Sequence, residues 1–178
     1  MILRSLMVAA MLVASSVMAE EMSAELKAKV DAKLKAVSAW STDAKIVEAV
    51  AAYNANPPAE CKEMTQEKWA ALTLISPEVK VFSKNALAEY LKTLKDESIS
   101  EMFVSGANGN KAAFLAKTTN WCHKGKPKHD VPMTGKSWVG KVETDESTGL
   151  RQVQVSVPVL EKGKAIGSLV VGLSVNKL

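Results

Sequence analysis

The chain has 178 residues, with 23 basic and 19 acidic side chains, a formal net charge of +4, two cysteines and two histidines. This length fits one domain with a substantial core. The lysines are scattered among acidic residues and form no basic block, so the charge pattern excludes the usual footprint of a nucleic-acid-binding protein.

The first nineteen residues have the layout of a bacterial secretory signal. Arg4 precedes an apolar run over residues 6–17, and small side chains end at Ala19. The run is shorter than the roughly 20 apolar residues that a membrane-spanning helix needs. We therefore predict a cleaved signal peptide at residues 1–19, one exported domain at residues 20–178 and a periplasmic location. That length leaves no room for a signalling output segment, so a signal would need a partner, such as a membrane-bound signalling protein.

The two cysteines are Cys61 and Cys122. In an oxidising compartment an even number of cysteines usually pairs, so we expect a disulfide between them. In the chain-entropy model a loop of this length stabilises the fold by about 4 kcal/mol.

The first half of the exported part predicts helices. A capping sequence at residues 41–43 opens a second helix that runs to Asn54, Thr65 caps a short third helix, and Ser76 opens a further helix. The first helix, residues 22–40, has apolar residues at spacings of four and three: Leu26, Val30, Leu34 and Val37. The stripe of the last helix is Leu87, Tyr90, Leu91 and Leu94.

After Glu97 the apolar period changes from about 3.6 to 2, which indicates a sheet. The predicted strands are residues 99–105, 111–116, 138–143, 151–160 and 165–174. In the fourth strand valines alternate with Gln152, Gln154 and Ser156, so one face is core and the other is polar. Helices followed by an antiparallel meander predict an α+β domain.

Three segments resemble the single Cache domains, which are extracytoplasmic PAS-like sensors of the PDC type. Residues 41–50 with Asn54 resemble the first-helix signature of that family, and residues 99–109 resemble its first strand and hairpin. The segment 140–172, with its turn at 145–149 and its valine-rich strands, is the most specific match.

The resemblance implies a PAS-like Cache domain, with a long N-terminal helix packed on a five-stranded antiparallel sheet. It implies a small ligand on the other face of the sheet, under a loop and a short helix. It implies no catalysed reaction and no cofactor. Cache domains recognise amino acids, carboxylates or other small metabolites. This sequence differs from the family pattern at residues 118–125. The segment is basic, whereas many relatives carry an acidic loop at this place.

The segment 121–130 concentrates both histidines, one cysteine and three lysines. We interpret it as a loop whose donors meet an anionic group, with Trp121 or Trp138 as an apolar wall. The alternative is an ordinary solvated basic loop with its tryptophan in the core. The candidate ligand-binding residues are Trp121, His123, His129, Trp138, Glu143, Arg151, Gln154 and Ser156. For the charged members the alternative is an ordinary surface ion pair.

Metal binding and catalysis find little support. Cys61, Cys122, His123 and His129 have zinc-ligand chemistry, but adjacent Cys122 and His123 point in different directions, so we predict no metal site. The sequence has no nucleophile elbow, zinc-protease motif or phosphate loop, so we predict that the protein is not an enzyme.

These observations favour a soluble periplasmic sensor domain for an anionic or zwitterionic metabolite, acting in signal transduction through a partner. One alternative is an interaction protein without a ligand, forming a homodimer through the N-terminal helix. Another is a metal- or redox-responsive periplasmic protein that uses the cysteines and histidines.

Overall fold

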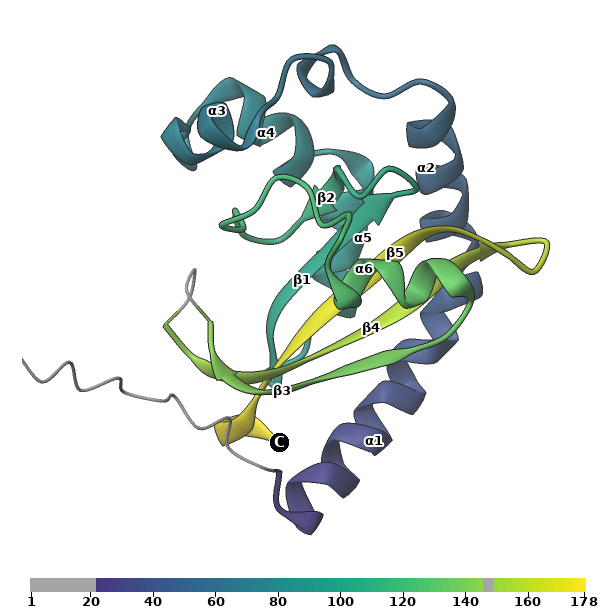
Figure 1. Cartoon of the computed structure of the whole chain (residues 1–178), viewed down its shortest axis with the longest axis vertical. Coiled ribbons are helices and arrows are strands. Elements are labelled where there is room, and N and C mark those ends of the chain that lie inside the picture. The colour runs from purple at the N-terminus through teal and green to yellow at the C-terminus, as the bar shows by residue number, and fades with distance from the viewer. Residues whose placement is uncertain (1–21, 146–148) are drawn as a thin grey trace, which may run out of the picture.

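The computed structural model describes residues 22–145 and 149–178 (Figure 1), so the predicted signal peptide lies outside the described residues. The α-helices of the described part are α1 (Ala24–Ser38), α2 (Ala44–Ala55), α3 (Gln66–Ala71), α4 (Pro77–Ser83), α5 (Ala86–Leu94) and α6 (Pro127–Asp130). Its strands are β1 (Ile99–Gly106), β2 (Lys111–Phe114), β3 (Trp138–Thr144), β4 (Arg151–Glu161) and β5 (Lys164–Ser174). Short 3-10 turns include η1 (Ala39–Thr42) and η3 (Pro132–Thr134).

Side-chain caps set where α2 and α3 begin. Asp43 Oδ1 accepts hydrogen bonds from the backbone N–H groups of Lys45 and Ile46 at 3.0 and 3.2 Å. Thr65 Oγ1 accepts one from the N–H of Lys68 at 3.2 Å. These bonds satisfy amides that have no partner within the helix. Both predicted caps are confirmed.

The predicted helix that opens at Ser76 is two helices. The first, α4, ends at Ser83, and Asn85 Oδ1 then accepts a hydrogen bond from the N–H of Ala88 at 2.8 Å and begins α5. The Asn85 amide also donates to the carbonyl of Ala112 on β2 at 2.9 Å. A single helix was the wrong prediction because Asn85 is a second N-cap that also ties the helix to the sheet.

The sheet is antiparallel throughout, with the strand order β2-β1-β5-β4-β3. The five-stranded antiparallel sheet is confirmed, but the simple meander is not, because β1 pairs with β5 instead of continuing the β3-β4-β5 hairpins. The first and last strands of the sequence thus lie side by side in the middle of the sheet. Glu101 and Gln154 both lie opposite Gly172 of β5, from its two sides.

One face of the sheet forms the core. The side chains that face α1, α2 and η1 from the central strands are apolar and buried, and they include Val153, Val155, Val157, Leu169, Val171 and Leu173. Each such side chain contributes about 1.5–3 kcal/mol when it is removed from water. The opposite face is covered by α6 and η3 and carries the polar residues of β4 (Figure 1).

Asn54, at the end of α2, ties the helical layer to two hairpins. Its Nδ2 donates to the carbonyl of Ile166 at 2.7 Å, and its Oδ1 accepts from the N–H of Ala107 at 3.0 Å. One side chain therefore satisfies two backbone groups at the ends of β1 and β5. Among residues 22–145 and 149–178, no helix combines the length and apolarity needed to cross a bilayer.

We predict that Asp43→Ala destabilises the protein. Asp43 caps α2, and its Oδ2 accepts a hydrogen bond from the Tyr90 hydroxyl at 2.7 Å. Loss of the cap costs about 0.5–2 kcal/mol, and the tyrosine bond adds to this. Urea unfolding followed by circular dichroism measures the change. Tyr90→Phe removes only the second interaction and should cost less; equal losses in the two variants would contradict the capping role.

Candidate functional site

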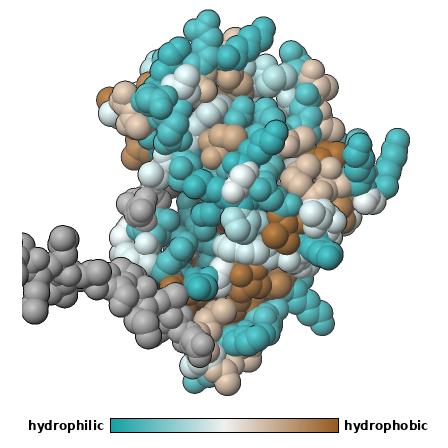
Figure 2. Space-filling model, viewed as in Figure 1, coloured by the Kyte–Doolittle hydropathy of each residue, from teal (hydrophilic) through white to brown (hydrophobic). Residues whose placement is uncertain are grey.

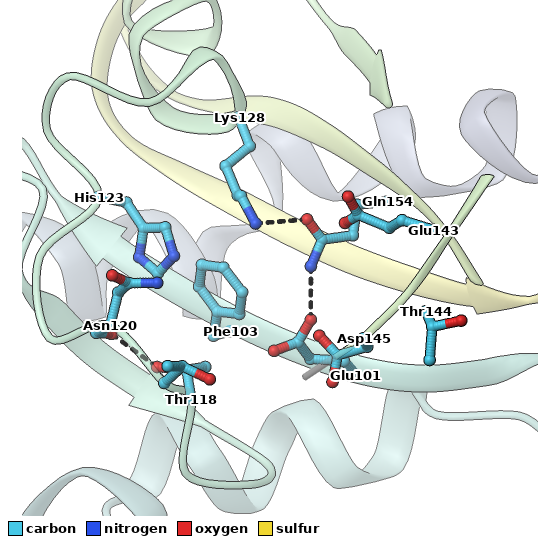
Figure 3. Close-up of a pocket in the computed structure, with 11 residues that line it drawn as sticks. Glu101, Phe103, Thr118, Asn120, His123, Lys128, Glu143, Thr144, Asp145 and Gln154 are labelled. Carbon is cyan, nitrogen blue, oxygen red and sulfur yellow. Dashed lines mark hydrogen bonds between the residues drawn. The ribbon is translucent and has the colours of Figure 1, made fainter. Parts of the chain in front are cut away.

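The polar face of the sheet carries a cavity of about 210 Å³ (Figure 3). Its walls come from β1, β4, the end of β3, α6 and the loop that leads from β2 to α6. Figure 2 shows hydrophilic side chains around a hollow on this face of the molecule. The lining residues are Glu101, Phe103, Thr118, Thr119, Asn120, His123, Lys128, Glu143, Thr144, Asp145 and Gln154.

A chain of hydrogen bonds crosses the sheet at the cavity (Figure 3). Lys128 Nζ donates to Gln154 Oε1 at 2.5 Å, and Gln154 Nε2 donates to Glu101 Oε2 at 2.7 Å. Gly172 lies between the last two on β5. A Cβ atom on Gly172 would come within 2.3 Å of Gln152 Oε1 and 3.0 Å of Glu101 Cβ. The glycine therefore leaves space for the side chains of Gln152 and Glu101.

One side of the cavity is acidic. Glu101 is only 4% exposed, and burial raises the pKa of its carboxyl group. The nearby Asp145 raises this pKa further, while the hydrogen bond from Gln154 opposes the shift. Glu143 and Asp145 come from the end of β3 and approach the same side (Figure 3). A cation that enters here gains the attraction of these carboxylates, so this side suits an ammonium group.

The opposite wall is formed by His123, which is 2% exposed. Its ring stacks on Phe103 at a centroid distance of 4.8 Å, and its backbone N–H donates to the carbonyl of Gly109 at 2.8 Å. Burial, followed by the charges of Lys111 and Lys128, lowers the pKa of His123 to about 2. The imidazole is therefore neutral at pH 7 and acts through hydrogen bonds instead of charge.

Helix α3 holds the loop that lines the cavity. Gln66 Nε2 donates to the carbonyl of Thr119 at 2.9 Å, and Gln66 Oε1 accepts from the N–H of Trp121 at 2.9 Å. Trp69 Nε1 donates to the carbonyl of Thr118 at 2.7 Å. Because these bonds fix backbone groups, the loop is positioned independently of any ligand.

The structure brings three of the predicted ligand-binding residues into the cavity: His123, Glu143 and Gln154. Trp121 does not line it. This side chain is 2% exposed and packs against Trp69 and Phe82, with ring centroids 5.1 Å away in both pairs. The core position, which was the alternative for this tryptophan, is the one observed.

The other four predicted residues lie outside the cavity lining. His129 is buried, with its Nδ1 2.8 Å from Ser168 Oγ. Trp138 is half-buried on β3, opposite Ser156 of β4, which is itself buried. Arg151 is exposed at the start of β4.

The two cysteines are free thiols in the structure, so the predicted disulfide is not formed in it. Cys61 Sγ lies 3.4 Å from the Tyr53 hydroxyl, and Cys122 Sγ donates to the carbonyl of Asn108 at 3.5 Å. Burial and then both cysteines raise the pKa of Tyr53. Cys61 therefore contacts the Tyr53 hydroxyl, and Cys122 is near enough to influence the pKa of that hydroxyl.

Sequence analysis missed Glu101 and Phe103, which form the floor of the cavity. A signal for Glu101 was available, because an isolated acidic residue in an apolar strand shares its face with Phe103 and Ser105 by simple alternation. Thr118 and Asn120 lie in the segment that sequence analysis described as basic. These two uncharged polar residues line the cavity. Lys128 was noted only as one of the loop lysines.

Within the part of the chain that the structure describes, no three His, Cys, Asp or Glu side chains are grouped to hold a metal ion. The cavity is lined by uncharged hydrogen-bonding groups, by carboxyl groups and by the amine of Lys128.

Solved structures share this fold. The chain is similar to the sensor domain of the histidine kinase DctB of V. cholerae, with a TM-score of 0.56 and 13% identity, over 86% of this chain and 53% of that chain. It is also similar to the sensory domain of the Campylobacter jejuni chemoreceptor Tlp3 with isoleucine bound (TM-score 0.40, 16% identity, 84% and 62% covered). A third structure is the ligand-binding domain of the Pseudomonas fluorescens chemoreceptor CtaA in complex with L-serine (TM-score 0.38, 12% identity, 83% and 60% covered).

The chain spans about half the length of the DctB sensor structure and about three fifths of the other two. No protein-family model and no curated protein matches the sequence. The likeness to the DctB sensor domain therefore shows the fold alone: an α+β, PAS-like arrangement with a long N-terminal helix on a five-stranded antiparallel sheet, the fold that the sequence resemblance implied.

We predict that Glu101→Gln stabilises the unliganded protein at neutral pH. Burial raises the pKa of Glu101, so between its unfolded and its folded pKa the folded state binds a proton that the unfolded state has released. The stabilising contribution of the protonated carboxyl is complete below the unfolded pKa and is lost as the pH rises through the folded pKa. Glutamine mimics the protonated form at every pH, so its advantage should grow with pH over this window by a few °C in Tm.

Thermal unfolding between pH 4 and 8 measures this effect. The control is Glu89→Gln, because Glu89 is exposed and its hydrogen bond with Lys92 lowers its pKa. That variant should not gain stability. A destabilised Glu101→Gln protein at pH 7 would show that the carboxylate is stabilising and would overturn the argument.

Proposed function

We propose that this protein is an exported ligand-binding sensor domain whose cavity takes a small zwitterionic metabolite. The observation that carries the proposal is the polarity of the cavity. Three carboxyl groups, from Glu101, Glu143 and Asp145, lie at one side, while His123 and Asn120 lie at the other. A purely anionic ligand would meet the carboxylates unfavourably, so a ligand with an ammonium group at that side fits better.

The size of the cavity supports a ligand no larger than a single amino acid or a short-chain metabolite. Sites for drug-sized ligands measure about 300–1,000 Å³, whereas this cavity measures about 210 Å³. The lining favours binding over turnover. The Thr118 hydroxyl donates to the Asn120 carbonyl, and the Glu101 carboxyl accepts from Gln154, so neither is set beside the other as a nucleophile with its base.

We also propose that residues 1–19 are a cleaved signal peptide and that the domain works in the periplasm, where it reports occupancy to a membrane-bound signalling protein. The layout of these residues in the sequence supports export. The shared fold with the sensor domain of a histidine kinase supports a sensory role.

The alternative, a homodimer through α1 without a ligand, is less well supported. The outer surface of α1 carries ion pairs within the chain: Lys27 with Asp31 at 2.6 Å, Lys29 with Glu25 at 3.0 Å, and Lys33 with Asp96 at 2.5 Å. Paired, solvated charges are typical of a helix face in contact with water.

A ligand screen tests the proposal. We expect thermal stabilisation by one or more zwitterionic amino acids, and weaker effects from the matching amines and carboxylic acids. A ligand at 100 times its Kd stabilises by about 2.7 kcal/mol. Glu101→Gln should weaken binding at least about tenfold, as expected for loss of a charged hydrogen-bond partner, whereas Glu161→Gln in the exposed β4–β5 turn should not. No stabilisation by any class of small molecule would count against a sensor.

We predict that Cys61 and Cys122 pair in protein recovered from the periplasm. The Tyr53 hydroxyl contacts Cys61 and its pKa is influenced by Cys122, and an oxidising compartment favours the disulfide. The intact mass should be about 2 Da below that of the reduced form, as expected for a single disulfide, and the chain should begin at residue 20. Cys61→Ser protein should show no such difference on reduction. Two titratable thiols in wild-type protein taken from the periplasm would contradict the pairing.

A further inference from the structure

Lys111 on β2 is a completely buried lysine. Its Nζ contacts Nδ1 of His123 and lies over the ring of Phe103, 3.9 Å from the centroid. Lys111 does not itself line the cavity, but both of its partners do. Burying an ammonium group is costly, so the contacts of Lys111 with its neighbours are the place to look for its role.

His123 is held from three directions. Its backbone N–H is bonded to Gly109, its ring is stacked on Phe103, and its Nδ1 is occupied by Lys111. The second ring nitrogen, Nε2, has no hydrogen-bond partner among residues 22–145 and 149–178. Since the ring lines the cavity, this nitrogen is the polar atom that His123 offers to a ligand.

The contact with Lys111 decides what Nε2 can do. An ammonium group has three donors and no acceptor, so a charged Lys111 requires a lone pair on the His123 Nδ1 that faces it. A neutral imidazole has one proton, which then resides on Nε2. Burial lowers the pKa of Lys111 well below its usual range, while the charge of Glu101 opposes that shift. A neutral amine still has two N–H groups that can donate to Nδ1.

We propose that Lys111 fixes His123 as an Nε2–H donor directed into the cavity, and that this pair selects a ligand with a carboxylate oxygen at that wall. The inference rests on the proposed function, because it orients the zwitterion in the same cavity: the carboxylate faces His123 and the ammonium faces Glu101. It also excludes a class of ligands. A diamine would place its second ammonium group against the Nε2–H of His123, which donates and cannot accept a hydrogen bond.

The first test needs no ligand. The chain has only two histidines, His123 and His129, so their ring nitrogens can be assigned by ¹⁵N NMR with a His129→Gln variant. We expect His123 in wild-type protein to be neutral, with its proton on Nε2. A proton on Nδ1 would overturn the inference, whatever the protein binds.

The second test compares matched ligands on the folded protein. Isothermal titration with a zwitterionic amino acid and with its decarboxylated amine gives the preference for a carboxylate. Lys111→Met should reduce that preference at least about tenfold and leave the affinity for the amine nearly unchanged. The control is Lys117→Met, because Lys117 lies over Trp69 and does not contact His123.

A second pair of variants decides the question if Lys111→Met does not fold. His123→Gln retains an N–H donor at this wall and should keep part of the preference, whereas His123→Leu should lose it. Equal preferences in these two variants would overturn the inference. If wild-type protein binds amines and zwitterions equally, the sensor proposal survives and the Lys111–His123 inference fails. If it binds no small molecule, the proposed function fails, and the NMR result still decides the tautomer.

Discussion

The hydrogen bond from Gln154 to Glu101 spans β5, the middle strand of the sheet, and both of its residues line the cavity. The two residues belong to strands on either side of β5, and both lie opposite Gly172, where a Cβ atom would come within 3.0 Å of Glu101 Cβ. The bond therefore depends on the register of three strands. That register is set on the other face, where the buried valines of β4 pack against the helices; a slip of one residue would turn them towards the cavity and Gln154 towards the core.

The sequence predicted the parts of this arrangement that follow from local pattern. Alternation located the strands closely and identified the polar face of β4 that carries Gln154, and capping residues located α2 and α3. Pairings between distant segments could not be read in the same way. The position of β1 beside β5 has no local signature in the sequence. The sequence therefore could not show that Glu101 lies across β5 from Gln154. The position of the Trp121 side chain could not be predicted for a related reason. Residue type does not say on which side of a loop a ring lies, and the ring that Trp121 packs against, Trp69, is on a helix about fifty residues earlier.

The polar face carries a stability cost that the core face must offset. Ser105 Oγ, Ser156 Oγ and Gln152 Nε2 are buried and have no hydrogen-bond partner within the described residues. Each such group costs about 1–3 kcal/mol. Glu101 adds a carboxyl whose pKa is raised by burial, and Lys111 adds an amine without solvent. The apolar side chains buried on the core face offset costs of this kind.

The two histidines show how neighbouring residues of one type acquire different roles. His129 contacts Ser168 through Nδ1, and the backbone of Ala107 opposes the lowering of its pKa by burial. His123 lies six residues earlier in the same loop, yet only its Nδ1 is engaged, and its other nitrogen borders the cavity. Both rings are buried, and burial lowers the pKa of both, so neither burial nor charge distinguishes them. The distinction is position: His129 lies outside the cavity lining, whereas the ring of His123 lines the cavity while Lys111 contacts its Nδ1.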